Sequence, residues 1–424
     1  MSEFKHIDLQ TLPERWTANF LGRIISFRMG KTPPRNQERY WTNGKYPWVS
    51  IADMIPFGTV IRTNEQVSED AHNLVFRKAI VPANSFLMSF KLTVGRVSRL
   101  GIPAYHNEAI ISFQPNPDKI HPQYLAYHLG QINYRDYQDT AVKGQTLNKG
   151  KLEKIEIVTP PLSEQRKIAQ VLGLVQRAIE QQERLLSLTI ELKRSLRHQL
   201  FTRGLRNEPQ KQTELGPIPQ SWEISTLGSL AKIGNGSTPK RDNKAYWEEG
   251  SIPWLNSAKI HERFITKANQ FVTDLAVKEC HLPRVKPGGL LIAITGQGKT
   301  LGSSALVLFE TCINQHLAYA QFRTGAIMPE FVLWFLQTRY KHLRSISQAG
   351  GSTKGALTCG YLKTYPIPIP RLDEQREIVA VFTALNQKEK LHRRKHASLK
   401  ALFRTLLHEL MTSHIRVANL ELLG

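Results

Sequence analysis

The segment PLSEQRKIA at residues 161–169 returns as RLDEQREI at residues 371–378, and the two copies set the architecture of the chain. Prolines precede each copy, and a long run almost free of glycine and proline follows it. Ser163 and Asp373 are residue types that commonly cap the first turn of a helix. Each copy therefore predicts the start of a long helix.

Apolar residues recur at every third or fourth position of both helices, which is typical of a heptad seam. The seam positions are Ile168, Leu172, Val175, Ile179, Gln182, Leu186, Thr189, Leu192, Leu196 and Leu200 in the first helix, and Ile378, Phe382, Leu385, Glu389, His392, His396, Leu399, Phe403, Leu406 and Leu410 in the second. We expect the two helices to pair. The alternative is that each helix packs only on its own globular domain.

Charge favours an antiparallel pair. Glu180 and Glu183 lie in the middle of the first helix, and a basic run at residues 388–395, which includes Arg394, lies in the middle of the second. Opposite charges on facing helices attract, so Glu183 and Arg394 are expected to couple. A parallel pair would bring the same middles together but would crowd both globular domains at one end. The alternative is that these charges only solvate an exposed face.

Outside the helices the chain contains one unit twice. LPERW at residues 12–16 returns as IPQSW at residues 218–222, and the same offset relates a tryptophan-containing turn at residues 40–48 to one at residues 246–254. Trp16, Trp48, Trp222 and Trp254 belong to this shared framework and are expected in the core. The interiors of the two copies differ more than their edges do.

These patterns predict an α+β protein with an internal pseudo-twofold repeat. Its two tandem globular domains are joined by two long helices that pair as an antiparallel coiled coil. Short β-branched runs between glycine and proline turns indicate the mixed globular domains. The expected boundaries are residues 1–159 for the first globular domain, 160–206 for the first helical spacer, 207–369 for the second globular domain and 370–424 for the second helical spacer.

Composition narrows the range of possible functions and partners. Among 424 residues, 57 Lys and Arg face 35 Asp and Glu, so the net charge is +22 and nucleic acid is the expected partner. The three cysteines form no C-x-x-C pair, which is typical of a reduced compartment. No signal peptide and no membrane-length apolar run is present. We therefore expect a cytoplasmic protein without a membrane partner.

Catalytic signatures are few, and we expect no catalytic residue, metal site or cofactor in this chain. The strongest exception is AITGQGKT at residues 293–300, which resembles a phosphate-binding loop but has Ala293 in place of the first glycine. The residues that follow it are predicted to form a strand, not a helix. The preferred interpretation is a basic glycine loop that touches a phosphate backbone through Lys299.

Basic and polar turns recur in both copies and are the candidate DNA contacts, because they combine donors for phosphate oxygens with side chains that can read base edges. The alternative for any one of them is an ordinary surface turn. The candidates are Lys31, Arg35, Asn36, Arg39, Lys91, Arg96, Lys143 and Gln145 in the first copy, and Lys240, Arg241, Lys244, Lys299, Ser352 and Lys354 in the second.

The segments at residues 161–169, 371–378 and 215–222, the last reading LGPIPQSW, resemble the DNA-specificity subunit of type I restriction–modification systems. The resemblance covers nearly the whole chain. It implies a non-catalytic subunit that reads a two-part site in double-stranded DNA. Each globular domain would be a target-recognition domain that reads one half of the site, and the helix pair would set the length of the unread gap. It also implies two methyltransferase subunits that bring S-adenosylmethionine and methylate adenines, and restriction–translocation subunits that bring ATP and Mg²⁺.

Three other functions stay open at this point. The chain could serve a methyltransferase-only system, since a nuclease would lie on another polypeptide. It could be a nucleotide-binding protein that uses the loop at residues 293–300, or a structural RNA-binding protein.

Overall fold

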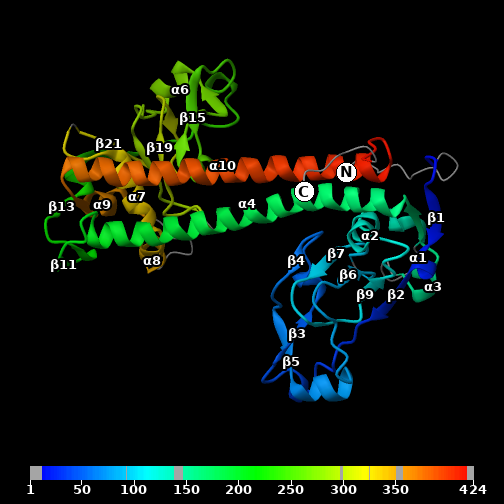
Figure 1. Ribbon diagram of the computed structural model, residues 1–424. Coiled ribbons are helices and arrows are strands. Elements are labelled where there is room, and N and C mark those ends of the chain that lie inside the picture. Colours follow the sequence, from blue (N-terminus) through cyan, green and yellow to red (C-terminus); the bar gives the residue numbers. More distant parts are fainter. Residues whose placement is uncertain are drawn as a thin grey trace. The chain divides into compact units, whose positions relative to one another are not determined.

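The computed structural model describes residues 12–91, 93–137, 147–296, 299–323, 325–349 and 357–417. The chain divides into two compact units (Figure 1). Unit 1 comprises Met1–Leu185 and His392–Gly424, and unit 2 comprises Leu186–Leu391. Two helices, α4 (Leu162–Arg203) and α10 (Leu372–Met411), contribute residues to both units.

Unit 1 is built on a five-stranded sheet with the order β2-β9-β6-β7-β4, a three-stranded sheet with the order β5-β3-β8, and the pair β1-β10. Its strands are β1 (Thr17–Phe20), β2 (Ile25–Met29), β3 (Tyr46–Val49), β4 (Thr59–Val60), β5 (Glu65–Val67), β6 (Phe86–Ser89), β7 (Val97–Leu100), β8 (Tyr105–His106), β9 (Ile110–Pro115) and β10 (Glu156–Thr159). Its shorter helices are α1 (Leu21–Ile24), η2 (Glu38–Tyr40), η3 (Ile51–Asp53), η4 (Ala71–Val75), α2 (Pro122–Leu129), η5 (Tyr134–Tyr137) and α3 (Lys149–Glu153).

Unit 2 repeats each of these sheets and, among the described residues, also contains the pair β11-β12. Its sheets have the orders β14-β21-β18-β19-β16 and β17-β15-β20, β13 pairs with β22, and β11 pairs with β12. The strands are β11 (Gln210–Thr213), β12 (Gly216–Pro219), β13 (Glu223–Thr226), β14 (Ala231–Asn235), β15 (Ile252–Leu255), β16 (Phe264–Ile265), β17 (Gln270–Val272), β18 (Leu290–Ala293), β19 (Ser304–Val307), β20 (Cys312–Ile313), β21 (Leu317–Phe322) and β22 (Pro366–Ile369). The shorter helices are α5 (Leu227–Leu230), η6 (Lys244–Tyr246), η7 (Ser257–Glu262), α6 (Asp274–Glu279), α7 (Pro329–Thr338), α8 (Tyr340–Ala349) and α9 (Cys359–Thr364). The predicted α+β class and internal repeat are confirmed.

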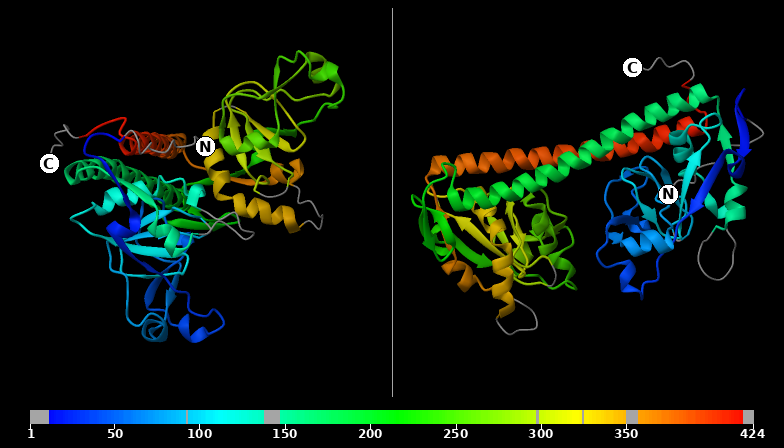
Figure 2. Two further views of the ribbon diagram at one scale, coloured as in Figure 1. Left: turned by 90° about the vertical axis from the view of Figure 1, so that its right-hand side faces the viewer. Right: turned by 60° about the horizontal axis from the view of Figure 1, so that its bottom comes forward.

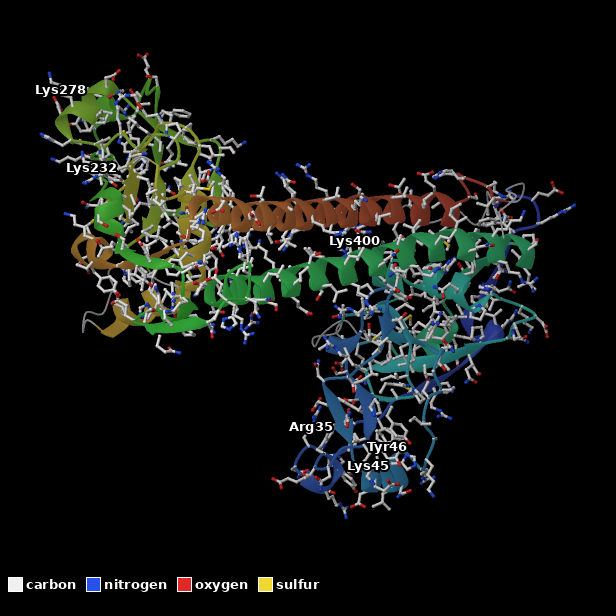
Figure 3. The ribbon with its side chains drawn as sticks, turned by 60° about the vertical axis from the view of Figure 1, so that its left-hand side comes forward. Arg35, Lys45, Tyr46, Lys232, Lys278 and Lys400 are labelled. Carbon is white, nitrogen blue, oxygen red and sulfur yellow. The ribbon has the colours of Figure 1, made fainter. Side chains whose placement is uncertain are left out.

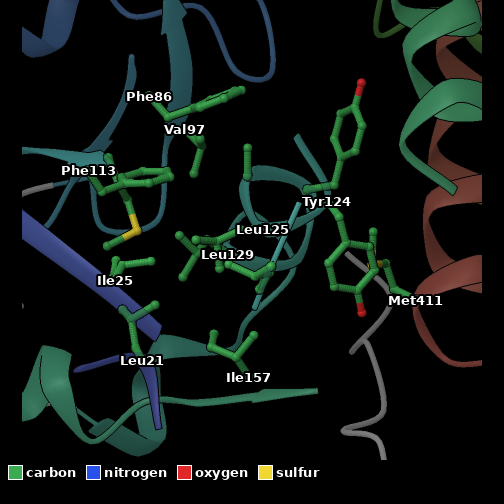
Figure 4. Close-up of a cluster of buried hydrophobic side chains, with 14 of the residues drawn as sticks. Leu21, Ile25, Phe86, Val97, Phe113, Tyr124, Leu125, Leu129, Ile157 and Met411 are labelled. Carbon is green, nitrogen blue, oxygen red and sulfur yellow. The ribbon is translucent and has the colours of Figure 1, made fainter. Parts of the chain in front are cut away.

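The core of unit 1 lies between the five-stranded sheet, α2 and the ends of the long helices that belong to this unit. Phe86, Val97 and Phe113 from the sheet face Leu125 and Leu129 from α2 (Figure 4). All five side chains are almost completely removed from water, and burial of apolar side chains of this size stabilises the fold by about 1.5–3 kcal/mol each. Unit 2 has an equivalent core around α7.

The repeated Glu-Gln pair that opens each long helix has a structural role. The indole N–H of Trp16 donates to Glu164 at 3.1 Å, and that of Trp222 donates to Glu374 at 3.0 Å. The following glutamine, Gln165 in unit 1, donates to the carbonyl oxygen of Pro160 at 2.7 Å. All four framework tryptophans, Trp16, Trp48, Trp222 and Trp254, are buried as predicted.

The long helices run antiparallel within each unit, as predicted, and lie side by side (Figure 2). In unit 1, Gln182 lies beside His392 at 2.8 Å, and Glu164, nearer the start of α4, binds Arg416, which follows α10. In unit 2, Lys193 binds Glu389 at 3.2 Å, while Glu374 at the start of α10 accepts from the backbone N–H of residue 205, which follows α4.

One predicted seam position is wrong. Leu192 is 50% exposed, and Lys193 is buried in its place. The Lys193 ammonium lies 5.3 Å from the centre of the Trp334 ring and 3.2 Å from Glu389. Burial, followed by the charge of Arg263, lowers the pKa of Lys193 to about 8. A cation with these partners displaces the leucine from the helix interface.

The charge pairing was predicted correctly for Glu183 but with the wrong partner. Its carboxylate lies 2.8 Å from Nε2 of His396 and 3.3 Å from Nζ of Lys400, while Arg394 is exposed. Positions 183, 396 and 400 therefore define the register of the helices in unit 1.

A double-mutant cycle on Glu183→Gln and Lys400→Gln is expected to give a coupling of about 0.2–1 kcal/mol in the free energy of unfolding, because the pair is close but half exposed. The matched cycle on Glu183→Gln and Arg394→Gln is expected to give none. Coupling to Arg394 that equals or exceeds coupling to Lys400 would mean that the helices pair in another register.

Candidate nucleic-acid interface

The loop between β2 and η2 in unit 1 holds Arg35 over two indole rings. Its guanidinium carbon lies 3.9 Å from the centre of the Trp41 ring and 5.0 Å from that of Trp48. Nη2 donates to Oε2 of Glu65 at 3.0 Å, and this hydrogen bond raises the pKa of Arg35 above its usual value. Arg35 lies in the part of unit 1 farthest from the helices, together with Lys45 and Tyr46 (Figure 3).

Unit 2 builds the same arrangement around Arg241. Its guanidinium carbon lies 3.9 Å from the centre of the Trp247 ring and 4.9 Å from that of Trp254. In both units the two indoles meet edge to face at 5.2 Å. Both units thus place an arginine over a pair of indoles at equivalent positions, and stacking on an indole orients the guanidinium without removing its capacity to donate hydrogen bonds.

The two arginines differ in their second partner. Strand pairing places Glu65 opposite Trp48 in unit 1 and Gln270 opposite Trp254 in unit 2, so Glu65 and Gln270 are equivalent. Arg241 donates to the amide oxygen of Gln270 at 3.1 Å. The arginine of unit 1 is balanced by a carboxylate, whereas that of unit 2 keeps its net charge in this arrangement.

The other basic candidates lie at varied sites. Lys31 Nζ donates to the carbonyl oxygen of residue 75 at 3.0 Å, and Arg96 Nη1 donates to that of residue 51 at 3.0 Å. Lys244 forms an exposed ion pair with Glu248 at 3.3 Å. The remaining placements are as follows: Arg39 donates to Gln37 and to Tyr40, Lys91 lies over the Phe90 ring at 5.4 Å, and Asn36, Lys240 and Lys299 are exposed.

The structure therefore gathers Arg35, Asn36 and Arg39 on the connection between β2 and β3, and Lys240, Arg241 and Lys244 on the equivalent connection between β14 and β15 in unit 2. Four candidates, Lys143, Gln145, Lys354 and Ser352, lie outside the described residues. The sequence did not single out the stacking role of Trp41 and Trp247, although both recur in register with Arg35 and Arg241. That recurrence was the available signal.

In the described part of the loop at residues 293–300, which leaves out residues 297 and 298, the flanking elements differ from those of a nucleotide site. Strand β18 ends at Ala293, and strand β19 begins at Ser304. A phosphate-binding loop opens a helix whose first N–H groups face the phosphates, and here a strand follows as predicted. The carbonyl oxygen of Lys299 accepts a hydrogen bond from Tyr340 at 2.8 Å.

Two further features bear on the expected partners. Among the described residues, no helix is both long and apolar enough to cross a membrane. Within the same ranges, the His and Glu side chains that lie close enough together to hold a metal ion are His408, Glu409 and His414, at the end of α10. His414 Nδ1 lies 3.6 Å from Glu409 and 2.9 Å from the Thr412 hydroxyl.

The repeated fold, with a stacked arginine and exposed basic residues in each copy, defines a protein with two equivalent sites suited to a polyanion. Residues 13–189 and 219–401 match the family described as the type I restriction modification DNA specificity domain. The chain belongs to this family.

Relatives match either nearly the whole chain or a part of it. The putative type I restriction enzyme MjaX specificity subunit of Methanocaldococcus jannaschii is 25% identical over 98% of this chain and 97% of its own length. The EcoR124I/EcoR124II specificity subunit of Escherichia coli is 26% identical over 38% of this chain and 39% of its own length. The crystal structure of the type I restriction–modification S subunit from M. genitalium shares the fold, with a TM-score of 0.60 and 16% identity over 93% of this chain and 96% of that one.

Proposed function

We propose that the chain recognises a two-part sequence in double-stranded DNA as the specificity subunit of a type I restriction–modification system, with one half-site read by each recognition domain. Residues 1–159 and 207–369 would read DNA, while residues 160–206 and 370–424 would set the unread gap. The observation that carries the proposal is one fold present twice with different side chains at equivalent positions, such as Glu65 and Gln270.

Phosphate binding and base reading would be divided among the loop residues. Exposed cations such as Lys240 and Lys244 suit phosphate oxygens, which carry no sequence information. Arg241, oriented by its indoles, suits two oxygens of one phosphate group, and the amide of Asn36 suits a base edge. Divergence between the copies then lets the two half-sites differ.

The proposal assigns chemistry to partner subunits. Two methyltransferase subunits would supply S-adenosylmethionine, and restriction–translocation subunits would supply ATP and Mg²⁺. The chain itself would bind DNA and position these partners, with no catalytic step of its own. Two similar units on one polypeptide suit two identical partners.

Replacing Arg241 by alanine is expected to weaken binding of the complex to duplex DNA and to lower the slope of log affinity against log salt by about 1, because one exposed cation is lost. The matched variant Gln270→Glu introduces the carboxylate that unit 1 carries and keeps the stacked arginine. It should also weaken DNA binding and lower the salt slope. Arg35→Ala is expected to have a smaller effect, since Glu65 already balances that charge.

Filter binding or fluorescence anisotropy over a salt series measures these slopes, with single-stranded RNA as a competitor. Unchanged slopes in both Arg241→Ala and Gln270→Glu would remove this loop from the interface. Preference for RNA over every duplex would contradict the proposed function itself.

A further inference from the structure

Unit 2 contains a cavity that none of the DNA-contact candidates lines. Its volume is about 290 Å³, and it lies between α4 and the globular part of unit 2. The residues that line it are Arg197, Ile260, His261, Arg263, Gly302, Ser303, Ser304, Gln337 and Tyr340. No carboxylate is among them.

Two arginines approach this cavity from different elements. Arg197 comes from α4, and Arg263 follows η7; both are half-buried. Burial, followed by the charges of Arg263 and Arg194, lowers the pKa of Arg197. Two cations held close in a partly dry site repel each other unless an anion lies between them.

Two acids that could balance this charge are already paired, and Glu262, which precedes Arg263, binds Lys259 at 2.7 Å. Glu389 is 3.2 Å from Lys193, and Arg263 Nη1 donates to the amide oxygen of Asn386 at 3.3 Å. Within the described ranges, Arg197 forms neither an ion pair nor a hydrogen bond. Positive charge therefore accumulates at this cavity.

Ser304 supplies an independent observation. Its side chain is only 5% exposed and lines the cavity, and its hydroxyl makes no hydrogen bond with any residue that the structure describes. A buried hydroxyl without a partner costs about 1–3 kcal/mol, so an acceptor in the cavity would remove a real penalty.

We propose that this cavity is a phosphate-binding site, in which the guanidinium groups of Arg197 and Arg263 and the hydroxyl of Ser304 donate to one tetrahedral oxyanion. Guanidinium groups match phosphate because they offer several donors in a plane, and charge-assisted hydrogen bonds are the strongest in proteins. The phosphate is a phosphodiester group of duplex DNA, and this assignment rests on the proposed function. Free phosphate has the same chemistry, and binding experiments with duplex DNA distinguish the two sources.

Unit 1 does not repeat the site. The carbonyl oxygen of Arg263 accepts from the N–H of Leu306 in β19, and in unit 1 the carbonyl oxygen of Gly58 accepts from the N–H of Arg99 in β7. Gly58 thus occupies the place of Arg263 and offers no side chain. The phosphate site therefore belongs to the second half of the chain alone.

Calorimetric titration of the full chain with inorganic phosphate at low ionic strength tests the site. Wild type should bind one phosphate saturably, and Arg197→Gln should weaken binding by at least about tenfold, which is the loss of one charge-assisted hydrogen bond. Ser304→Ala should weaken it less, and Arg197→Lys should recover part of it. Lys278→Gln, which removes an exposed charge elsewhere in unit 2, should leave binding unchanged.

Thermal unfolding shows whether each variant folds. If Arg197→Gln does not fold, Ser304→Ala still decides the test. Absence of saturable phosphate binding, or equal binding by wild type, Arg197→Gln and Ser304→Ala, would overturn the site.

The source of the phosphate is tested with duplex DNA. For a DNA phosphodiester, Arg197→Gln should lower the salt slope by about 1, and inorganic phosphate should compete with DNA. An unchanged DNA slope together with Arg197-dependent phosphate binding would overturn the DNA assignment in favour of free phosphate. If the wild-type complex bound no duplex DNA, the proposed function would fail, while the phosphate titration would still decide the site.

Discussion

Acidification from about pH 7 to about pH 4.5 is expected to destabilise unit 1 by several kcal/mol more than unit 2. The cause is two buried imidazoles, since burial lowers the pKa of His106 to about 4 and that of His128 to about 4. The unfolded chain takes up protons near the ordinary value of 6.5, whereas the folded unit does so only near 4. Stability is therefore complete above about pH 6.5 and falls as the pH drops towards 4.

The size of the effect follows from the shift. Each pKa unit corresponds to about 1.4 kcal/mol, so each histidine contributes a loss of roughly 2–3 kcal/mol over this range. Half-buried His121 in unit 1 and exposed His342 in unit 2 have pKa values shifted in the same direction. They do not remove the difference between the units.

The repeat itself supplies the comparison. His106 lies beside Val49 in the pairing of β3 with β8, and Ile313 takes that place beside Leu255 in unit 2. His128 is in α2, where Nε2 accepts from the backbone N–H of Val158 at 3.2 Å. The corresponding position of α7, counted from its first proline, holds an apolar residue, Phe335.

Urea unfolding at both pH values, followed by tryptophan fluorescence, measures the loss. The variant His106→Ile borrows the residue of unit 2 and should remove about half of the pH-dependent loss without changing the rest. Equal acid sensitivity of wild type and His106→Ile would show that this imidazole is not held neutral by burial.

Replacing Phe382 by alanine is expected to cost about 3–5 kcal/mol of unfolding free energy in unit 2. Phe382 is completely buried on α10, and its ring stacks on Trp334 of α7 at 5.0 Å and on Phe201 of α4 at 6.0 Å. It therefore joins both long helices to the globular part of the unit. Truncation would leave a cavity at the point where these three elements meet.

Leu391→Ala is the matched control, because Leu391 is 50% exposed on the same helix. We expect a change within about 0.5 kcal/mol for this variant. Denaturant unfolding followed by the fluorescence of Trp334 and Trp222 separates the two outcomes. Similar small effects for both variants would mean that α10 does not pack on the domain of unit 2 as described.

The repeat and the paired helices could be predicted because they depend on local signals: proline boundaries, caps and a spacing of three or four residues. The placement of Lys193 in the seam instead of Leu192 could not be predicted. A helix of 3.6 residues per turn lets either neighbour face the seam, and the choice is made by Trp334, Asn386 and Glu389, which come from distant parts of the sequence.

The candidate nucleic-acid interface was likewise predictable only in part. Arg35 and Arg241 were predicted because they recur in register, but their stacking on indoles and the exchange of Glu65 for Gln270 depend on strand pairing. Arg197 carried no local signal, since an arginine on a long helix usually faces water. Its importance follows only from the approach of Arg263 and Ser304 to the same cavity.

We propose that two copies of one fold read two different half-sites for a partner methyltransferase. The most direct test is to assemble the chain with its methyltransferase subunits and to map methylated adenines on random duplex DNA by sequencing. We expect two short specified sequences separated by a gap of fixed length. A single continuous motif, or no methylation and no stable complex while the chain alone binds RNA or hydrolyses ATP, would contradict the account.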